Sequence, residues 1–537
     1  MIDLSATLLV DQKGAGVTGA AYEQLWKVVL SLSGQTTRGY DRSRVLQIQH
    51  TEEEDNGVAE VLLQNSDLAI DSTVSADNFE QYQGIIHYGY HTGISRSAWV
   101  KNTAYKAYVK GVSAADVVIP TTVNGYQYKC VVAGSSHATT QPTWPTDLGV
   151  RVTDGTVTWE MDGNAGDEYT PRAPLRVEGQ EFISSETQLI CRLYLTGIPN
   201  DMAGDEAEDD YEVEDTDTNT CKDLISAIAG ATLDPYTNYT GYTVTYDGED
   251  SLIDSFKPKD YFSVNINENR DDKIQELLNY TGCKRRAEAD GAIHVLVPIT
   301  DYTSILYDYE YRLLVDTYHT FFAKALRNRF VNPNKEVVRT PGEIQPQYEG
   351  DATSATSYAL KKKIHTTQLR VTSSAQCTSI AEAKIGQYEL NAERGSIKAP
   401  LNCGQEIWDY IKVTDARNDD SRVGNVQYIQ FNCKSPEIDG SGDFSMNIRF
   451  GRVNTQTIGA VASGKYISEG AGIPQWLIDY INDMLDDIKT LYSNQNIMID
   501  NAISLREKLN ELINYINRGV VPKWHITTEA RAPVDDR

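Results

Sequence analysis

The chain has 537 residues, with 76 Asp and Glu against 49 Lys and Arg, so its formal net charge is −27 at neutral pH. That charge argues against binding nucleic acid through phosphate contacts, because such binding needs a basic surface. We expect three or four domains, since a single hydrophobic core stops growing at roughly 250–300 residues.

Membrane insertion and export are not expected from the sequence. It contains no apolar run of about 18 residues, and its first residues, MIDLSATLLVDQKG, lack the basic and apolar segments of a signal peptide. The seven Cys are scattered singly and form no CxxC pair. This pattern predicts reduced, buried thiols at Cys130, Cys191, Cys221, Cys283, Cys377, Cys403 and Cys433.

Alternating apolar and polar residues predict a β-barrel domain over residues 1–96 and 164–200. The strand-like runs RVLQIQH and VAEVLLQN flank the turn-like EEEDNG, and QYQGIIHYGY follows. The alternation resumes at APLRVEGQEFISS and TQLICRLYLTGI. An insertion into a loop of this domain, over residues 97–163, explains the interruption.

The insertion has three Trp, many Tyr and turn residues, and no helical periodicity. It resembles small carbohydrate-binding modules of the chitin-binding type and related repeats of phage tail and baseplate proteins. The resemblance rests on Trp99, Tyr105, the VVIP strand at Val117–Pro120, and four motifs: NGxxYxC at Asn124–Cys130, AGxS at Ala133–Ser136, PxWP at Pro142–Pro145 and DGxxxW at Asp154–Trp159.

The resemblance implies a carbohydrate site built from aromatic rings, because sugar C–H faces pack on exposed rings. The candidates are Trp144, Tyr126, Tyr128, Trp99 and Trp159. Trp99 and Trp159, on the first and last strands, are better explained as core residues. Trp144, between two prolines, and Tyr126 are the better candidates for an exposed platform. Such modules also serve as spacers, so sugar binding stays open.

An α+β segment is predicted over residues 201–310. It begins with the acidic run Asp205–Asp217, which reads as a solvated loop because it lacks the Gly and the spacing of a calcium-binding EF-hand loop. The helix in TCKDLISAIAGATL has Thr220 as its predicted N-cap, and DDKIQELLNYTG predicts a second helix. Next comes a hairpin with an Asp290-Gly291 turn. Its basic cluster, Lys284–Arg286, is either strand-edge charge or a contact for an acidic partner chain.

The next predicted domain is a second β-barrel over residues 311–455. Strand patterns include EIWDYIKVTDA and GNVQYIQFNCK, and SIAEAKIGQYELNAERG predicts a helix. A Gly- and Ser-containing linker follows at residues 456–474. The tail at residues 519–537 is expected to be either disordered or a strand offered to a partner.

Residues 475–518 carry a heptad repeat without Gly or Pro. Apolar positions alternate in steps of four and three, which predicts a parallel coiled coil between identical chains. A helical hairpin within one chain, turning at Ser493–Asn496, is the alternative. The predicted oligomerisation residues are Leu477, Ile481, Met484, Ile488, Leu491, Gln495, Met498, Leu505, Leu509, Leu512 and Ile516, with Ala502 also in the seam.

The order of these parts resembles the tail hub proteins of tailed bacteriophages and related tail-like particles. The resemblance rests on VLLQNSDLAI, on APLRVEG, on TCKDLISAIAG followed by DDKIQELLNYTGCKRRAEADGAIHVLVP, and on the two strand patterns of the second barrel. It implies a mainly β fold with α+β parts, in which each subunit supplies two tube-like barrels and a homotrimer meets the hexameric tail tube. The fold class is therefore expected to be mainly β.

The same resemblance implies a structural virion protein, assembled in the host cytoplasm, through which DNA passes without binding. Implied partners are the tail tube or distal tail protein, the tape-measure protein, a tail-tip or spike protein at the carboxyl terminus, and possible host glycans.

Enzymatic activity is not expected, since no GxSxG, HExxH or P-loop motif is present, and no cofactor is predicted. The eight His are isolated in the sequence, so no metal site is predicted. The alternative is a non-phage surface or secreted carbohydrate-binding protein, or a glycan-degrading enzyme with an accessory binding module.

Overall fold

The computed structural model divides into two compact units, Met1–Arg452 and Val453–Arg537. It describes residues 1–450 except 15–22, 72–73, 75–76, 185–187, 215, 300–305, 314, 316, 329–330, 356, 358–361, 418–419, 437–439 and 441. All of the described residues belong to the first unit. The predicted linker, coiled coil and tail, including every predicted oligomerisation residue from Leu477 to Ile516, lie outside them.

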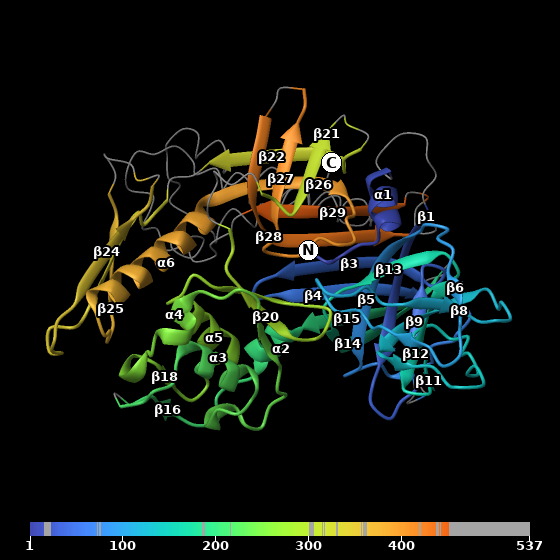
Figure 1. Cartoon of the computed structure of the whole chain (residues 1–537), viewed down its shortest axis with the longest axis horizontal. Coiled ribbons are helices and arrows are strands. Elements are labelled where there is room, and N and C mark those ends of the chain that lie inside the picture. Colours follow the sequence, from blue (N-terminus) through green and yellow to red (C-terminus); the bar gives the residue numbers. More distant parts are fainter. Residues whose placement is uncertain are drawn as a thin grey trace, which may run out of the picture. The chain divides into compact units, whose positions relative to one another are not determined.

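The largest sheet of this unit has 14 strands (Figure 1). Its first half runs in the order β2-β1-β5-β14-β15-β4-β3, with β13 also paired to β5. These strands are β1 (Glu23–Ser31), β2 (Arg38–Asp41), β3 (Val45–Glu53), β4 (Gly57–Gln64), β5 (Gln83–His91), β13 (Asp167–Pro171), β14 (Leu175–Ser184) and β15 (Leu189–Gly197). Helix α1 (Ala6–Gly14) precedes them. The alternation predicted for β3 and β4 is confirmed by their burial patterns.

The second half of the sheet continues from β3 without a break. It runs β28-β29-β26-β22, and β27 pairs with both β28 and β21. The strands are β21 (Tyr309–Leu313), β22 (Ala323–Asn328), β26 (Glu393–Pro400), β27 (Tyr410–Asp415), β28 (Asp420–Lys434) and β29 (Asp443–Phe450). The joint is an antiparallel register from Tyr428↔Glu53 to Lys434↔Gln47. One hydrophobic core extends under both halves.

The prediction of a mainly β fold is confirmed, but the two separate barrels are not seen. Among the described residues the hydrogen-bonded order is open, with β2 and β22 at its two ends. The physical reason lies at β3, which pairs with β4 along one edge and with β28 along the other. Both of its backbone edges are thereby satisfied, so β3 has no free edge left with which to close a barrel.

The insertion folds around a core of its own. A five-stranded sheet runs β11-β12-β9-β8-β6, and β10 pairs with β7. The strands are β6 (Ser97–Ala98), β7 (Ala104–Tyr105), β8 (Val117–Ile119), β9 (Tyr126–Val132), β10 (Gly134–Ser135), β11 (Arg151–Asp154) and β12 (Val157–Asn164). Its core holds Trp99, Val118, Tyr128, Cys130, Val157, Trp159 and Met161. We call residues 97–163 the inserted module.

The segment after the first half of the sheet is α+β, as predicted. Its helices are α2 (Ile198–Gly204), α3 (Cys221–Ala229), α4 (Ser251–Ser255) and α5 (Arg270–Leu278), with short 3-10 helices at Asp234–Tyr236 and Lys259–Tyr261. Thr220 caps α3 in a capping box with Asp223, which confirms the predicted cap. Its strands are β16 (Tyr211–Glu212), β17 (Val244–Tyr246), β18 (Ser263–Val264), β19 (Lys284–Ala287) and β20 (Ile293–Leu296). Gly291 has φ +80° in the turn between β19 and β20.

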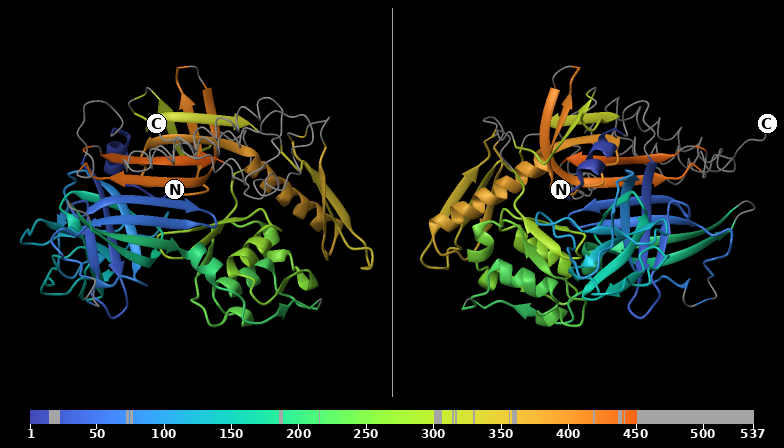
Figure 2. Two further views of the ribbon diagram at one scale, coloured as in Figure 1. Left: turned by 180° about the vertical axis from the view of Figure 1, so that it is seen from behind. Right: turned by 45° about the vertical axis from the view of Figure 1, so that its right-hand side comes forward.

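One further layer contacts this α+β segment although it lies later in the chain. The sheet β24-β23-β25 consists of β23 (Lys335–Arg339), β24 (Glu349–Thr353) and β25 (Ile364–Gln368), and it is followed by α6 (Ser374–Ala392). Residues of β23 and α6 share a core with α3 and α5, and Figure 2 shows the long α6 beside this sheet in both views. The predicted helix is confirmed, starting five residues earlier at Ser374.

Candidate functional site

The five aromatic candidates of the inserted module divide into buried and partly exposed rings. Trp99 and Trp159 are buried, and both indole N–H groups donate to Oδ2 of Asp154, at 2.7 and 3.2 Å. Tyr128 is also buried, and its hydroxyl donates to the carbonyl oxygen of Pro145 at 2.8 Å. Because these three rings are enclosed, they offer no open face to a sugar.

Trp144 and Tyr126 are the members of the set that remain partly exposed. The Trp144 ring packs on Tyr128, with centroids 4.3 Å apart, and lies edge-on to Trp159. Its indole N–H donates to Oε1 of Gln141 at 3.3 Å. One side of Trp144 thus supports the module's core, and the residual exposure of Trp144 and Tyr126 defines the candidate glycan-binding face.

The module is attached to the main sheet by a buried ion pair, which we call the root contact. Lys27 on β1 is fully buried, and its Nζ lies 2.8 Å from Oδ1 of Asp162 on β12. The ammonium group also donates to the Asp162 carbonyl and lies 4.0 Å from the Tyr169 ring centroid. Burial alone would raise the pKa of Asp162, but the charges of Lys27 and Lys129 lower that pKa to about 2. Asp162 is therefore ionised at neutral pH.

Shape complementarity accompanies this ion pair. A Cβ atom at Gly39 on β2 would lie 2.3 Å from the carbonyl oxygen of Leu148 in the module. Gly149 has φ +78°, and a Cβ atom there would lie 2.5 Å from Cγ1 of Val29 on β1. The backbone of the module therefore approaches β1 and β2 at positions where only glycine fits without a shift.

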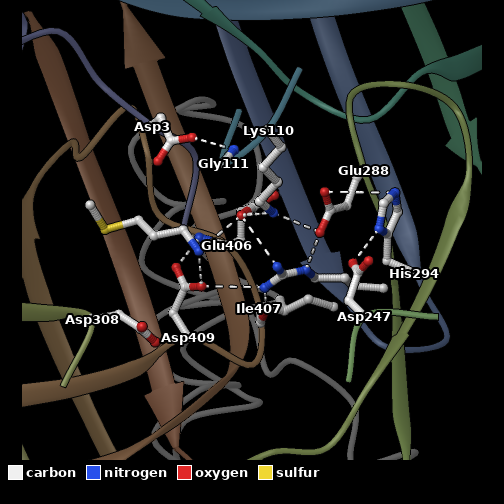
Figure 3. Close-up of polar contacts among 12 residues, drawn as sticks. Asp3, Lys110, Gly111, Asp247, Glu288, His294, Asp308, Glu406, Ile407 and Asp409 are labelled. Atoms are coloured by element: carbon white, nitrogen blue, oxygen red, sulfur yellow. Dashed lines mark hydrogen bonds and ion pairs between the residues drawn. The ribbon is translucent and has the colours of Figure 1, made fainter. Parts of the chain in front are cut away.

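A second attachment, the tip contact, is formed by the loop after β7 (Figure 3). Nζ of Lys110 lies 2.7 Å from Oε1 of Glu288 and 2.7 Å from Oε2 of Glu406. The neighbouring Gly111 amide donates to Oδ2 of Asp3 at 2.7 Å. The module is thus joined to the α+β segment and to the loop before β27, as well as to β1.

Arg286 on β19 connects the partners of the tip contact to one another. Its Nε donates to Oε1 of Glu288 at 2.7 Å, and its Nη1 donates to the Ile407 carbonyl and to Asp409, at 2.8 and 3.3 Å. Burial alone would raise the pKa of Glu406, but the charge of Arg286 holds it well below its usual range. The tip contact is therefore a network of charges.

The predicted basic cluster is turned inward. Lys284, Arg285 and Arg286 are buried, with carboxylate partners within the chain: Glu54 for Lys284, Asp271 for Arg285, and Glu288 for Arg286. The hypothesis that this cluster meets an acidic partner chain is therefore wrong. The acidic residues that pair with it come from the turn after β3, from α5 and from the hairpin itself.

The fold also surrounds His294 with carboxylates, which sequence spacing did not reveal. Nδ1 lies 2.5 Å from Oδ2 of Asp247, and Nε2 lies 3.1 Å from Oδ2 of Asp290. Burial lowers the pKa of His294, but the hydrogen bonds to Asp290 and Asp247 outweigh it and raise the pKa to about 9. The spacing of Glu288, Asp290 and His294 in EADGAIH could have predicted that these side chains lie close together, because a tight hairpin turn brings them side by side.

Comparison with known proteins gives matches in structure only. No family model and no curated protein matches the chain. A tail protein from Neisseria meningitidis is similar with TM-score 0.46 and 10% identity, over 80% of this chain and 96% of that one. The 43 kDa tail protein of prophage MuSo2 from Shewanella oneidensis gives TM-score 0.39 and 11% identity, over 79% and 98%. Prophage tail protein gp18 from Listeria monocytogenes gives TM-score 0.38 and 8% identity, over 82% and 98%.

The state of the cysteines and the character of the helices were also considered in the sequence. All seven Cys are buried and free, as predicted. Within the described residues, no helix is both long and apolar enough to cross a membrane.

Proposed function

We propose that this protein is a structural component of a phage-type tail, a trimeric hub that connects a hexameric tail tube to the tail tip. The observation that carries the proposal is the continuous sheet formed by two sets of strands through β3 and β28. Each chain thus offers two adjoining sheet halves, and three chains around one axis would offer six. A threefold ring can in this way match a sixfold tube.

The outward face of the joint between β3 and β28 is suited to a passage for DNA. Opposed pairs Gln430↔Thr51 and Asn432↔Gln49 lie on the face opposite the buried Ile48, Ile429 and Phe431. These four side chains are neutral amides and a hydroxyl, and the same face carries Glu53 at one end of the register and Lys434 at the other. With one acidic and one basic residue, the joint has no net charge that would hold phosphates. In our proposal this face lines the passage, and the net charge of −27 on each chain discourages adsorption of DNA elsewhere.

Measuring the mass of the full chain in solution tests the assembly. The expected result is three times 59.8 kDa, alone or with a tube protein. The predicted seam supplies matched variants: Ile488→Asp or Leu505→Asp should weaken the trimer, because a charge in a coiled-coil core is destabilising. Tyr194→Glu, which places a charge at an exposed position of β15 outside the predicted coiled coil, serves as control. A stable monomer at micromolar concentration would contradict the hub.

The inserted module would be a peripheral element that binds host surface glycans in three copies. Support comes from the partly exposed Trp144 and Tyr126 beside the polar Gln141 and Asn124. A glycan array probed with the full chain tests this, with Tyr126→Ala expected to weaken binding. Tyr194→Ala, which removes an exposed ring on β15, is the control. If no cell-wall or capsule glycan binds, the module acts as a spacer.

A further inference from the structure

Strand β25 lies at one edge of the sheet β24-β23-β25, and β23 is its hydrogen-bonded neighbour. The carbonyl oxygen of Lys363, just before β25, accepts the N–H of Lys335 on β23 at 3.3 Å. Because the backbone groups of successive residues point to opposite sides of a strand, the odd-numbered residues of β25 bond to β23. The residues whose N–H and C=O groups point away from the sheet are Ile364, Thr366 and Gln368. An open edge of this kind is a template for a further strand.

This edge is exposed and basic. Every residue of β25 is exposed except Thr367, which is half-buried, and the exposed fraction of Ile364 is 56%. Lys362 and Lys363 precede the strand and are exposed, and neither has an ion-pair partner among the residues that the structure describes. Two adjacent unpaired lysines are a local exception on a chain with net charge −27. The edge therefore suits an extended segment that carries carboxylates.

The acidic run is a segment of this kind. Between residues 206 and 214 its exposed carboxylates are Glu206, Glu208, Asp209, Asp210, Glu212 and Glu214. Within the described part of the chain, none of them forms an ion pair with Lys or Arg.

The backbone of the acidic run is also available on one side. Strand β16, in the middle of the run, pairs with β18 through Tyr211↔Val264 and Glu212↔Ser263, and the next residue, Val213, is buried. Among the described strands, none pairs with the other edge of β16. The run therefore combines negative charge with a second open strand edge.

We propose that β25 of one copy binds the acidic run of a second copy, within the assembly proposed above, on which this inference rests. The run lies along β25 as an added strand, with its carboxylates beside Lys362 and Lys363 and its backbone bonded to the outward groups of β25. The two surfaces differ, so the contact is heterologous and can close into a ring of copies. It brings opposite charges together where chains of net charge −27 would otherwise repel one another.

Zero-length carbodiimide cross-linking tests the contact, because it joins an ammonium group to a carboxylate only where the two groups meet. Oligomers assembled from equal amounts of ¹⁵N-labelled and unlabelled full chain are cross-linked, digested and examined by mass spectrometry. The expected product joins Lys362 or Lys363 of one copy to a carboxylate of residues 206–214 of another. A link between two copies is recognised because it can carry one labelled and one unlabelled peptide, whereas a link within a copy cannot.

Charge reversal tests whether the two surfaces attract each other. The background is Ile488→Asp, in which the predicted coiled coil is weakened and no longer masks other contacts. Lys362→Glu/Lys363→Glu and Asp209→Lys/Asp210→Lys should each lower the association constant about 10-fold, measured by sedimentation, because like charges then meet. All four substitutions together should restore it, since the opposite charges are only exchanged.

Two matched controls accompany these variants. Lys101→Glu/Lys106→Glu makes the same change in net charge at exposed lysines of the inserted module, and it should change association far less. Thr366→Pro removes an outward N–H but leaves the ladder to β23 intact, as proline does on edge strands, and it should weaken association. Thr366→Val keeps that N–H and should associate as the background does.

The outcomes separate this contact from the hub itself. A monomeric parent chain would contradict the hub. An oligomeric parent chain without the mixed-isotope link would overturn the contact alone. So would a fourfold charge variant that associates as weakly as either pair of reversals, or an Ile488→Asp background without measurable association. Circular dichroism and melting curves confirm that each variant is folded.

Discussion

The two attachments of the inserted module differ in how they exclude water. At the root contact, Lys27 is fully buried against Asp162, and glycines allow the module's backbone to approach β1 and β2. At the tip contact, Lys110 is 28% exposed, and the loop also exposes Val109 and Val112. Removal of one partner of an isolated buried pair leaves an uncompensated charge. At the tip contact, Arg286 remains beside both Glu288 and Glu406 when Lys110 is removed. We therefore expect loss of the root contact to destabilise the protein more than loss of the tip contact.

The largest effect is expected for Lys27→Met. This variant leaves Asp162 ionised and buried without its partner, which typically costs about 3–5 kcal/mol. Urea unfolding followed by Trp fluorescence measures the loss. The double variant Lys27→Met/Asp162→Leu should recover most of it, because neither charge is then buried. A single variant as stable as the parent chain would show that the root contact is not decisive.

Acid should weaken the root contact but spare the double variant. The pKa of Asp162 in the folded protein is about 2, below the value of ~3.9 for an unperturbed Asp. A depressed pKa contributes stability above the unfolded value and loses it as pH falls, here between about pH 4 and 2, by about 2–3 kcal/mol. The unfolding free energy of the parent chain minus that of Lys27→Met/Asp162→Leu should therefore fall by about 2–3 kcal/mol across this range. A constant difference would contradict the assignment.

Close packing at the root can be separated from backbone strain by two glycine variants. Gly149 and Gly34 have nearly the same φ, +78° and +80°, but a Cβ atom at Gly34 would meet nothing within 4 Å. Both alanine variants suffer the left-handed backbone cost. Gly149→Ala should lose about 1–3 kcal/mol more than Gly34→Ala, because it also forces the module away from Val29. Equal melting temperatures would argue against a tight root.

The smallest effect is expected at the tip contact. Lys110→Met should cost about 1 kcal/mol or less, and the cost should fall at high salt, because Lys110 is partly exposed and Arg286 still neutralises Glu288 and Glu406. Hydrogen exchange should become faster in the loop of residues 108–113. Lys101→Met, at an exposed lysine of the same module, is the control. A loss as large as that of Lys27→Met would erase the distinction between the two contacts.

Features of this fold that depend on residues close together in the sequence can be predicted from it. Contacts between residues that are far apart in the sequence cannot. The cap at Thr220, the turn at Gly291 and the alternation in β3 all depend on neighbours within a few residues. The pairing of β3 with β28 joins strands that are far apart in the chain. It is formed by backbone hydrogen bonds, which every residue type except proline can make, so the side chains do not identify the partner strand. Lys27 reads as a surface lysine because its partner lies 135 positions away.

The candidate site shows the same limit. The division of the module's aromatic residues into core and surface was foreseen from their strand positions for Trp99, Trp159, Trp144 and Tyr126. Tyr128, placed with the binding candidates, is buried because alternate residues of β9 point into the module's core. One of the carboxylates around His294, that of Asp247, comes from the residue after β17, and nothing near His294 in sequence indicates that Asp247 is its neighbour.

The joint between β3 and β28 has a mechanical consequence. From Tyr428↔Glu53 to Lys434↔Gln47 the two strands are held by backbone hydrogen bonds in register, and bending them apart would break that ladder as a unit. The two halves of the sheet therefore cannot move apart at this joint without breaking its hydrogen bonds. In the proposed trimeric ring, widening of the channel would therefore take place where one copy meets the next, or in the segments that cap the channel.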